Sequence, residues 1–339
     1  MAAASTYDTN LERVWNEIRD LGLEPYVAEL DAKGYTVIPP EIANPNGLCE
    51  RMLEAVLDIA ERRNGERPDM ETGSTHAHLG VETTAQARRE GPGKLRGRLP
   101  SITGKEIDSP HGDLMQSIYW EDPVFEESIM NPVLLAMATY LCGYGVILSA
   151  MGCWMKGPNY SNFNLHTDSP MPAPMPSTSY VCQCTYVLTD YNRENGATAF
   201  VPGSHKWCRQ PVGREAIVGE GGNEQAVPVE AKAGSLLVWH GGTWHGAVNR
   251  TAPGLRVGVT NFMVRPFIKP QEDFIGRIPQ EVLDRNSARF AIVMQQGTVE
   301  SRHSPEDGQR KVARAAKFTD AYAKEIGNTG PRPIKDLYS

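Results

Sequence analysis

The feature that most constrains the fold is a series of short β-rich segments, separated by turn residues, that begins beyond Gly143. The segments are VILSAMGCWMK, YVCQCTYVLTD, TAFVPG, AVPVEA, SLLVWHGG, WHGAVN and LRVGVTNFMVRPF, with no helical pattern between them. Consecutive parallel strands need a long crossover, usually a helix, between them. The order of segments therefore predicts an antiparallel sandwich or barrel, and we expect this β core to occupy residues 143–268.

Helical patterns flank the core on both sides. Residues 9–31 carry apolar positions at helical spacing, and GYTVIPP then predicts a short strand stopped by two prolines. An amphipathic helix ends at the RRNG segment, and DPVFEESIMNPVLLAMATYLCG is again helical, with Pro132 starting a second helix. The tail from Gln271 returns to helix. These patterns predict a mainly β fold with flanking helices.

A polar stretch rich in Gly, Arg and Thr interrupts the N-terminal helical region at residues 66–109. Long loops of this kind often serve as lids or binding segments, and a floppy surface insertion is the alternative. We expect a single domain, 1–339, built from a mostly helical N-terminal region (1–142), the core (143–268) and a helical extension (269–339).

Composition excludes several classes of protein. A chain of 339 residues with 40% hydrophobic and 22% charged residues buries a full core. The net charge of −7 gives no basic footprint for nucleic acid and little attraction to an anionic membrane. The N-terminal segment lacks a secretory pattern, and no apolar run reaches the roughly 18 residues that span a bilayer, so we expect a cytoplasmic monomer or homodimer. Six scattered cysteines are expected to be reduced thiols: Cys49, Cys142, Cys153, Cys182, Cys184 and Cys208.

The segment NLHTDSPMP places His166 and Asp168 two residues apart, so that on extended chain they share a face. A mononuclear iron site for oxygen activation needs two imidazoles and one carboxylate on one face of the metal. Taken alone, the pair could equally be two polar residues in a turn. A second copy, His111-Gly-Asp113, lies in a Ser-Pro/Gly context without a downstream partner, and it is interpreted as a turn or helix start.

The best third ligand is His245, which lies on a predicted strand, with Arg256 eleven residues later on the next strand. Alternation along LRVGVTNF puts Arg256 on the face opposite the apolar residues, where a buried guanidinium suits bidentate binding of a carboxylate. His240 competes for the same role because Arg250 follows it by ten residues. We prefer His245 because Arg250 falls in the turn NRTAPG.

The order His166-x-Asp168, His245, Arg256 resembles the phytanoyl-CoA dioxygenase family of iron(II)/2-oxoglutarate oxygenases. The segments NGATAFVPGSHK, GYTVIPP and PVLLAMATYLCG resemble the same family, and the likeness covers residues 25–268. It implies a double-stranded β-helix (jelly-roll, cupin-like) core in which His166, Asp168 and His245 hold Fe(II). Arg256 would then bind the distal carboxylate of 2-oxoglutarate.

The same resemblance suggests Thr185 as a second cosubstrate contact and Gln116 as a third. Relatives often have a serine two residues after the distal histidine, whereas this chain has Ala247, so either another hydroxyl substitutes or Arg256 acts alone. Asp168 favours hydroxylation over halogenation, because halogenases of this superfamily replace the carboxylate with a small residue.

Three other histidines and three tryptophans are expected to have structural roles or to face solvent. His205 is expected to order a turn, and His76 and His78 are interpreted as solvent-facing. The core or the pocket wall is expected to contain Trp154, Trp239 and Trp244.

The function that the resemblance implies is an Fe(II)/2-oxoglutarate-dependent dioxygenase. It would use O2 to hydroxylate a small organic molecule, with secondary metabolism as one setting, while 2-oxoglutarate is decarboxylated to succinate and CO2. Desaturation, epoxidation, cyclisation and endoperoxidation stay open, because the substrate pose decides between them. Outside this class, a jelly-roll binding protein without turnover would be expected to lack a ligand or the arginine. A cupin-like isomerase or hydrolase using zinc would not need 2-oxoglutarate.

Overall fold

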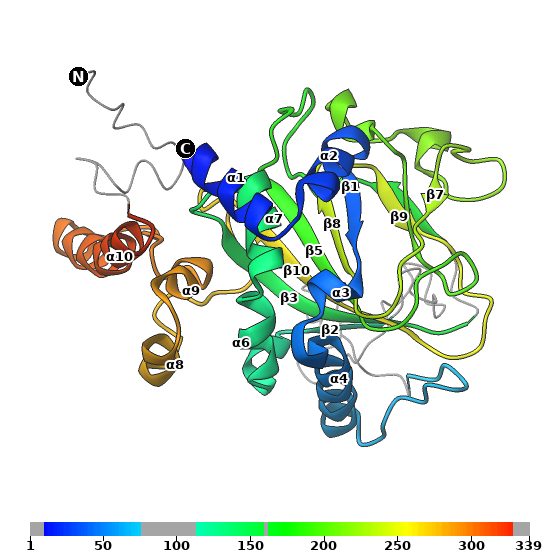
Figure 1. Ribbon diagram of the computed structural model, residues 1–339, viewed down its shortest axis with the longest axis horizontal. Coiled ribbons are helices and arrows are strands. Elements are labelled where there is room, and N and C mark those ends of the chain that lie inside the picture. Colours follow the sequence, from blue (N-terminus) through cyan, green and yellow to red (C-terminus); the bar gives the residue numbers. More distant parts are fainter. Residues whose placement is uncertain (1–9, 76–112, 159–161, 328–339) are drawn as a thin grey trace.

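The computed structural model describes residues 10–75, 113–158 and 162–327 (Figure 1). Most of the polar stretch 66–109, including His76 and His78, lies outside these ranges, as does His111.

Ten strands form two antiparallel sheets within the described ranges of the chain. The strands are β1 Tyr35–Ile38, β2 Asp113–Gln116, β3 Ile147–Lys156, β4 Phe163–His166, β5 Val181–Val187, β6 Thr198–Phe200, β7 Val227–Pro228, β8 Leu236–His240, β9 His245–Ala247 and β10 Arg256–Val264. The major sheet has the order β1-β8-β5-β10-β3-β2, and the minor sheet has the order β4-β9-β6-β7. The prediction of an antiparallel β core is confirmed, and its segments form strands at the expected places.

Helices lie before β1, between β1 and β3, and after β10. They are α1 Asn10–Asp20, α2 Glu24–Lys33, α3 Pro40–Ala43, α4 Leu48–Asn64, α6 Val124–Ile129, α7 Pro132–Cys142, α8 Gln280–Arg285, α9 Ala288–Val293 and α10 Pro305–Glu325. Short 3-10 turns lie at Pro45–Gly47, Ile118–Glu121, Ser204–Trp207 and Gly213–Ala216. Among the residues that the structure describes, no helix is both long enough and apolar enough to cross a bilayer.

The two faces of the major sheet have different partners. Helix α7 packs on β5, β8 and β10, and the outward side chains of these strands, such as Val257 and Val259, join the large apolar core that contains the helices. On the inner face a second apolar cluster joins the two sheets, and in it Tyr35 of β1 stacks on Phe200 of β6 with ring centroids 4.3 Å apart. Polar side chains on the inner face of the major sheet therefore lie between the sheets.

Two local predictions need correction. The apolar pattern at 9–31 is two helices, because Gly22 adopts a left-handed φ of 66° and breaks the chain between α1 and α2. Asp113 does not start a turn or a helix but begins strand β2, which pairs with β3. A strand of four residues is too short for periodicity to predict, and its pairing with β3 decides its conformation.

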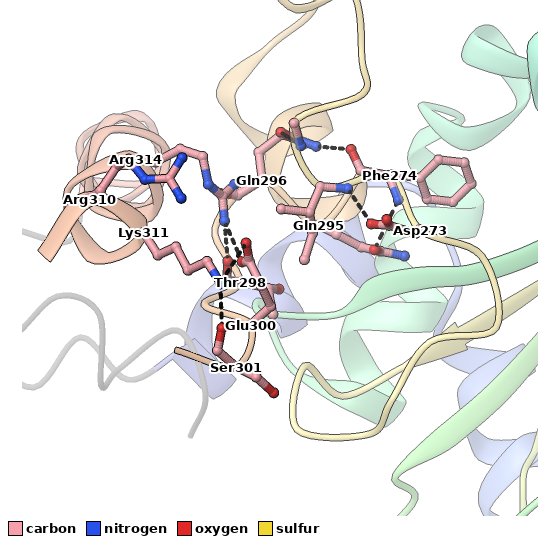
Figure 2. Close-up of polar contacts among 12 residues, drawn as sticks. Asp273, Phe274, Gln295, Gln296, Thr298, Glu300, Ser301, Arg310, Lys311 and Arg314 are labelled. Atoms are coloured by element: carbon pink, nitrogen blue, oxygen red, sulfur yellow. Dashed lines mark hydrogen bonds and ion pairs between the residues drawn. The ribbon is translucent and has the colours of Figure 1, made fainter. Parts of the chain in front are cut away.

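The C-terminal helices lie at the opposite end of the molecule from β7 and β9 (Figure 1). Arg314 of α10 donates hydrogen bonds to the carbonyls of Gln296 and Thr298 and pairs with Glu300 at 3.1 Å, as Figure 2 shows. The buried Gln295 side chain donates to the carbonyl oxygens of Leu148 in β3 and of Glu272. These contacts attach the helical extension to the edge of the β core.

Candidate metal centre

Strands β4 and β9 bring two histidines together. His166 ends β4 and His245 begins β9, and the two residues are direct partners in the antiparallel register, with ring centroids 4.3 Å apart. Asp168 follows β4 by two residues, and its carboxylate oxygens lie 3.9 Å from Nε2 of His166 and 3.5 Å from Nε2 of His245. One ligand atom of each side chain lies within 4.8 Å of the others, a spacing that could hold a metal ion.

Backbone carbonyls orient both imidazole rings. Nδ1 of His166 lies 3.1 Å from the carbonyl oxygen of Asn164, and Nδ1 of His245 lies 3.0 Å from that of Thr243. Because a carbonyl oxygen only accepts, Nδ1 carries the proton in both rings, and the lone pair of Nε2 faces Asp168. This is the arrangement that metal-binding histidines show, so the residues fit a divalent metal ion.

Burial favours the neutral, metal-binding form of one imidazole. Desolvation lowers the pKa of His245 to about 4, although the nearby Asp168 carboxylate opposes the shift. The side chains of His166, Asp168 and His245 are 35%, 14% and 8% exposed, so the site is open to small molecules from the side of His166.

Trp239 of β8 reaches this centre from the major sheet. Its indole Nε1–H donates to Oδ2 of Asp168 at 3.0 Å, and its ring lies 5.1 Å from that of His245. From the sequence, Trp239 was expected to lie in the core or in the pocket wall. No sequence signal marks the contact, because the tryptophan and the aspartate are far apart along the chain and meet only when the two sheets pack.

A cavity of about 440 Å³ opens between the sheets beside the carboxylate. Its polar lining includes Gln116, Asp168, Gln183 and Thr260. Its apolar lining includes Leu114, Met151, Trp154, Pro170, Phe262 and Ile268. Thr185 does not line the cavity, but its hydroxyl oxygen lies 3.0 Å from that of Thr260, which does. Gln116 is thus a wall residue of this cavity, and Thr185 supports a wall residue.

Arg256 is buried on the inner face of β10, as the alternation predicted. Its guanidinium donates to the carbonyl oxygen of Gly196 at 2.7 Å and lies over the ring of Tyr191, 5.1 Å from the centroid. Gly258 makes room for this tyrosine, because a Cβ atom there would lie 2.3 Å from the Tyr191 hydroxyl oxygen. Arg256 does not line the 440 Å³ cavity.

The rival histidine, His240, lies elsewhere. Its Nδ1 accepts the N–H of Gly242 at 2.9 Å, and its Nε2 lies 3.2 Å from the carbonyl oxygen of Ser177. Both ring nitrogens therefore have backbone partners, and the three-residue cluster contains His245 instead. His205 is buried beside His240, with ring centroids 5.2 Å apart, in the turn that follows β6.

Two imidazoles and one carboxylate between the sheets of a jelly roll form the arrangement found in mononuclear non-haem iron oxygenases. A model of the phytanoyl-CoA dioxygenase (PhyH) family matches residues 103–258, a segment that contains the three clustered residues and Arg256. Over this segment the chain is similar to the phytanoyl-CoA dioxygenase family.

Individual proteins show the same likeness. Dioxygenase af480 of Aspergillus fumigatus is 28% identical over 174 residues, which cover 51% of this chain and 53% of that protein. The uncharacterized protein Rv1501 of Mycobacterium tuberculosis is 24% identical over 220 residues, covering 61% of this chain and 77% of Rv1501. The crystal structure of EvdMO1 matches with a TM-score of 0.50 at 18% identity, over 73% of this chain and 50% of EvdMO1, and this likeness supports the fold. The chain thus spans about half the length of af480.

Proposed function

We propose that the protein is a non-haem Fe(II)/2-oxoglutarate-dependent dioxygenase that hydroxylates a small organic molecule, with release of succinate and CO2. The observation that carries the proposal is the cluster of His166, Asp168 and His245 at a cavity between the sheets, with Arg256 buried on the facing sheet. A zinc isomerase would not need a buried arginine for a dicarboxylic cosubstrate.

In this proposal His166, Asp168 and His245 hold Fe(II), and Arg256 binds the distal carboxylate of 2-oxoglutarate. When bound, iron and 2-oxoglutarate supply the activation of O2 and the oxidising power of the reaction. Trp239 holds the Asp168 carboxylate in place through its indole N–H. The remaining residues bind and orient the substrate and exclude water.

The cavity wall indicates the chemistry of the substrate. Trp154 and Phe262 offer flat apolar surfaces, while the amide side chains of Gln116 and Gln183 offer hydrogen bonds. Oε1 of Gln183 is buried without a hydrogen-bond partner among the described residues, so it can accept a bond from a hydroxyl or amide of a ligand. A compact, largely apolar molecule with a few hydroxyl or carbonyl groups fits this lining. Substrates of this kind occur in secondary metabolism.

The organisation of the whole protein also belongs to the proposal. Residues 1–339 form one dioxygenase domain, with the jelly-roll core at 143–268 between the mostly helical N-terminal region (1–142) and the helical extension (269–339). The proposal includes a cytoplasmic monomer or homodimer, and the net charge of −7 supports a protein that binds neither nucleic acid nor membrane.

Anaerobic reconstitution with Fe(II) tests the proposal. After O2 is admitted, succinate formation from 2-oxoglutarate is measured with and without a panel of small scaffolds. Wild type is expected to form succinate, and His166→Ala and Arg256→Met are expected to lower the rate at least about 100-fold. His303→Ala and Arg310→Met, which change exposed side chains on the helical extension, serve as matched controls. Succinate formation at the wild-type rate in His166→Ala would contradict the proposed site.

A further inference from the structure

The cavity beside the metal centre has a cation at its mouth. Among the described residues that line it, two are charged, Asp168 and Lys269. Lys269 follows the end of β10 by five residues and is exposed, as are Pro170 and Gln271 in the same wall. These exposed residues mark the place where the cavity meets solvent. Lys269 is therefore a positive charge that a ligand meets on entering.

The fold does not use the ammonium group of Lys269. Within residues 10–75, 113–158 and 162–327, its Nζ has no hydrogen-bond or ion-pair partner. The nearest carboxylate along the chain is that of Glu272. It accepts the backbone N–H and the hydroxyl of Ser117 and the N–H of Met151, so its oxygens are already occupied. The charge of Lys269 is thus available to a ligand.

Lys269 and Arg256 lie towards opposite ends of strand β3. Arg256 is the register partner of Lys156, the last residue of this strand. Near the beginning of the strand, the hydroxyl oxygen of Ser149 accepts the N–H of Gln271 at 3.0 Å and holds the segment that contains Lys269. A carboxylate bound by Lys269 would therefore be separate from a cosubstrate carboxylate bound by Arg256.

A row of side chains on three adjacent strands leads from the cavity wall to the metal centre. Gln183 of β5 is the register partner of Phe262 in β10 and of Trp239 in β8, and Trp239 donates to Asp168. Oε1 of Gln183 is buried without a hydrogen-bond partner among the described residues. Because buried carbonyl oxygens are normally paired, this atom suits a donor group on the ligand. That part of the ligand would lie next to the tryptophan that holds Asp168.

The wall between these two polar groups is apolar. It contains the side chains of Met151, Trp154, Phe262 and Ile268. A single ammonium group matches a single negative charge, as on a carboxylate, whereas a phosphate monoester carries about −1.5 to −2 at pH 7. The lining therefore fits a molecule with one carboxylate, an apolar body and an uncharged end.

We propose that the substrate is a compact monocarboxylic acid and that Lys269 determines this preference by binding its carboxylate at the mouth of the cavity. The carbon to be oxidised then lies towards the uncharged end of the molecule, beside Gln183 and Asp168. This assignment rests on the proposed function and names its substrate class.

Calorimetry on the protein loaded with nickel and 2-oxoglutarate, without O2, measures substrate binding apart from turnover. The probes are phenylacetate, hydrocinnamate and cyclohexanecarboxylate, each paired with its primary amide, which has nearly the same shape and no charge. Wild type is expected to bind at least one acid about 5- to 20-fold more tightly than its amide, because the acid forms a charged hydrogen bond at a partly exposed site.

Variants of Lys269 assign this preference to its charge. Lys269→Met is expected to bind the acid and its amide equally, Lys269→Arg to keep the preference for the acid, and Lys269→Glu to prefer the amide. Lys232→Met changes another exposed lysine and should match wild type with every probe.

The outcomes separate the substrate class from the proposed function. Equal binding of acids and amides by wild type, no binding of any acid in the panel, or an unchanged preference in Lys269→Met would overturn the assignment. A loss of 2-oxoglutarate affinity in Lys269→Met as large as the loss for the acid would also overturn it, because the lysine would then serve the cosubstrate. If wild type binds no 2-oxoglutarate, the proposed function itself fails.

Discussion

At the scale of single residues, the carboxylate of Asp168 depends on an indole from the opposite sheet. Trp239→Phe keeps an aromatic ring beside His245 but removes the Nε1–H that donates to Oδ2 of Asp168. Loss of a hydrogen bond to a ligating carboxylate typically weakens metal binding about 10- to 100-fold, and we expect this result here. Anaerobic titration with Co(II) or Fe(II) measures the affinity.

The matched control is Trp120→Phe, a change at an exposed tryptophan that packs on Tyr119 and Phe274 far along the chain from the ligands. Its metal affinity should equal that of wild type. Equal affinities of Trp239→Phe and wild type would mean that the indole does not position Asp168.

The sequence predicted some residues of the candidate site better than others. The spacing of His166, Asp168, His245 and Arg256 was visible because each lies in a recognisable segment. The contact of Trp239 with Asp168 was not visible, because the two residues are far apart along the chain and meet only when the two sheets pack. The roles proposed for all these residues stay predictions until binding is measured.

At the scale of elements, Arg314 helps to attach α10 to residues 296–300, and it differs sharply from Arg310 on the same helix. Arg314 is 25% exposed and bonds to two backbone carbonyls and Glu300, whereas Arg310, one turn earlier, is 77% exposed and pairs with Asp307 (Figure 2). We expect Arg314→Met to lower the free energy of unfolding by about 1–3 kcal/mol, because two part-buried carbonyl oxygens lose their charged donor.

Arg310→Met changes the same residue type on the same helix, and an exposed ion pair contributes at most about 1 kcal/mol. Its unfolding free energy should stay within about 0.5 kcal/mol of wild type. Urea denaturation measures both variants. Equal stabilities for the two would show that the attachment of α10 to residues 296–300 does not limit unfolding.

Elements with a strong local signal were predicted, and those defined by pairing were not. α7 follows from Pro132 and an unbroken apolar run, and Asn131 caps it by accepting the N–H of Val133. Strand β2 and the break at Gly22 escaped prediction, because four residues are too few for a period and because apolar positions recur on both sides of the glycine.

At the scale of the whole molecule, the site exists because two sheets face each other. The register of β4 against β9 places two histidines side by side, and the register of β3 against β10 places Lys156 beside Arg256. The sequence predicted strands and their faces, but strand order depends on contacts across the chain. It therefore could not show that the metal cluster and Arg256 lie on opposite sheets.

Folding also buries histidines in neutral form, which makes stability depend on pH; burial lowers the pKa of His205 as well as those of His240 and His245. Desolvation lowers the pKa of His240 to about 4, and the nearby His205 adds to the shift; the pKa of His245 is also lowered to about 4. The unfolded chain, with an ordinary histidine pKa near 6.5, therefore binds these protons first. Stability is complete above about pH 6.5 and is lost as the pH falls towards 4.

For the metal-free protein between pH 6.5 and 5, we expect His240 and His245 each to lower the unfolding free energy by up to about 1.4 kcal/mol per pH unit. His240→Gln removes one of these groups, and its side-chain amide can keep a hydrogen bond to the backbone of Gly242 or Ser177. The variant should therefore show a smaller slope than wild type, whatever its stability at neutral pH, while His205 and His245 keep part of the dependence. Urea denaturation at a series of pH values measures both slopes. Equal slopes would mean that His240 is protonated in the folded protein, and that its bond from the Gly242 N–H does not hold the neutral form.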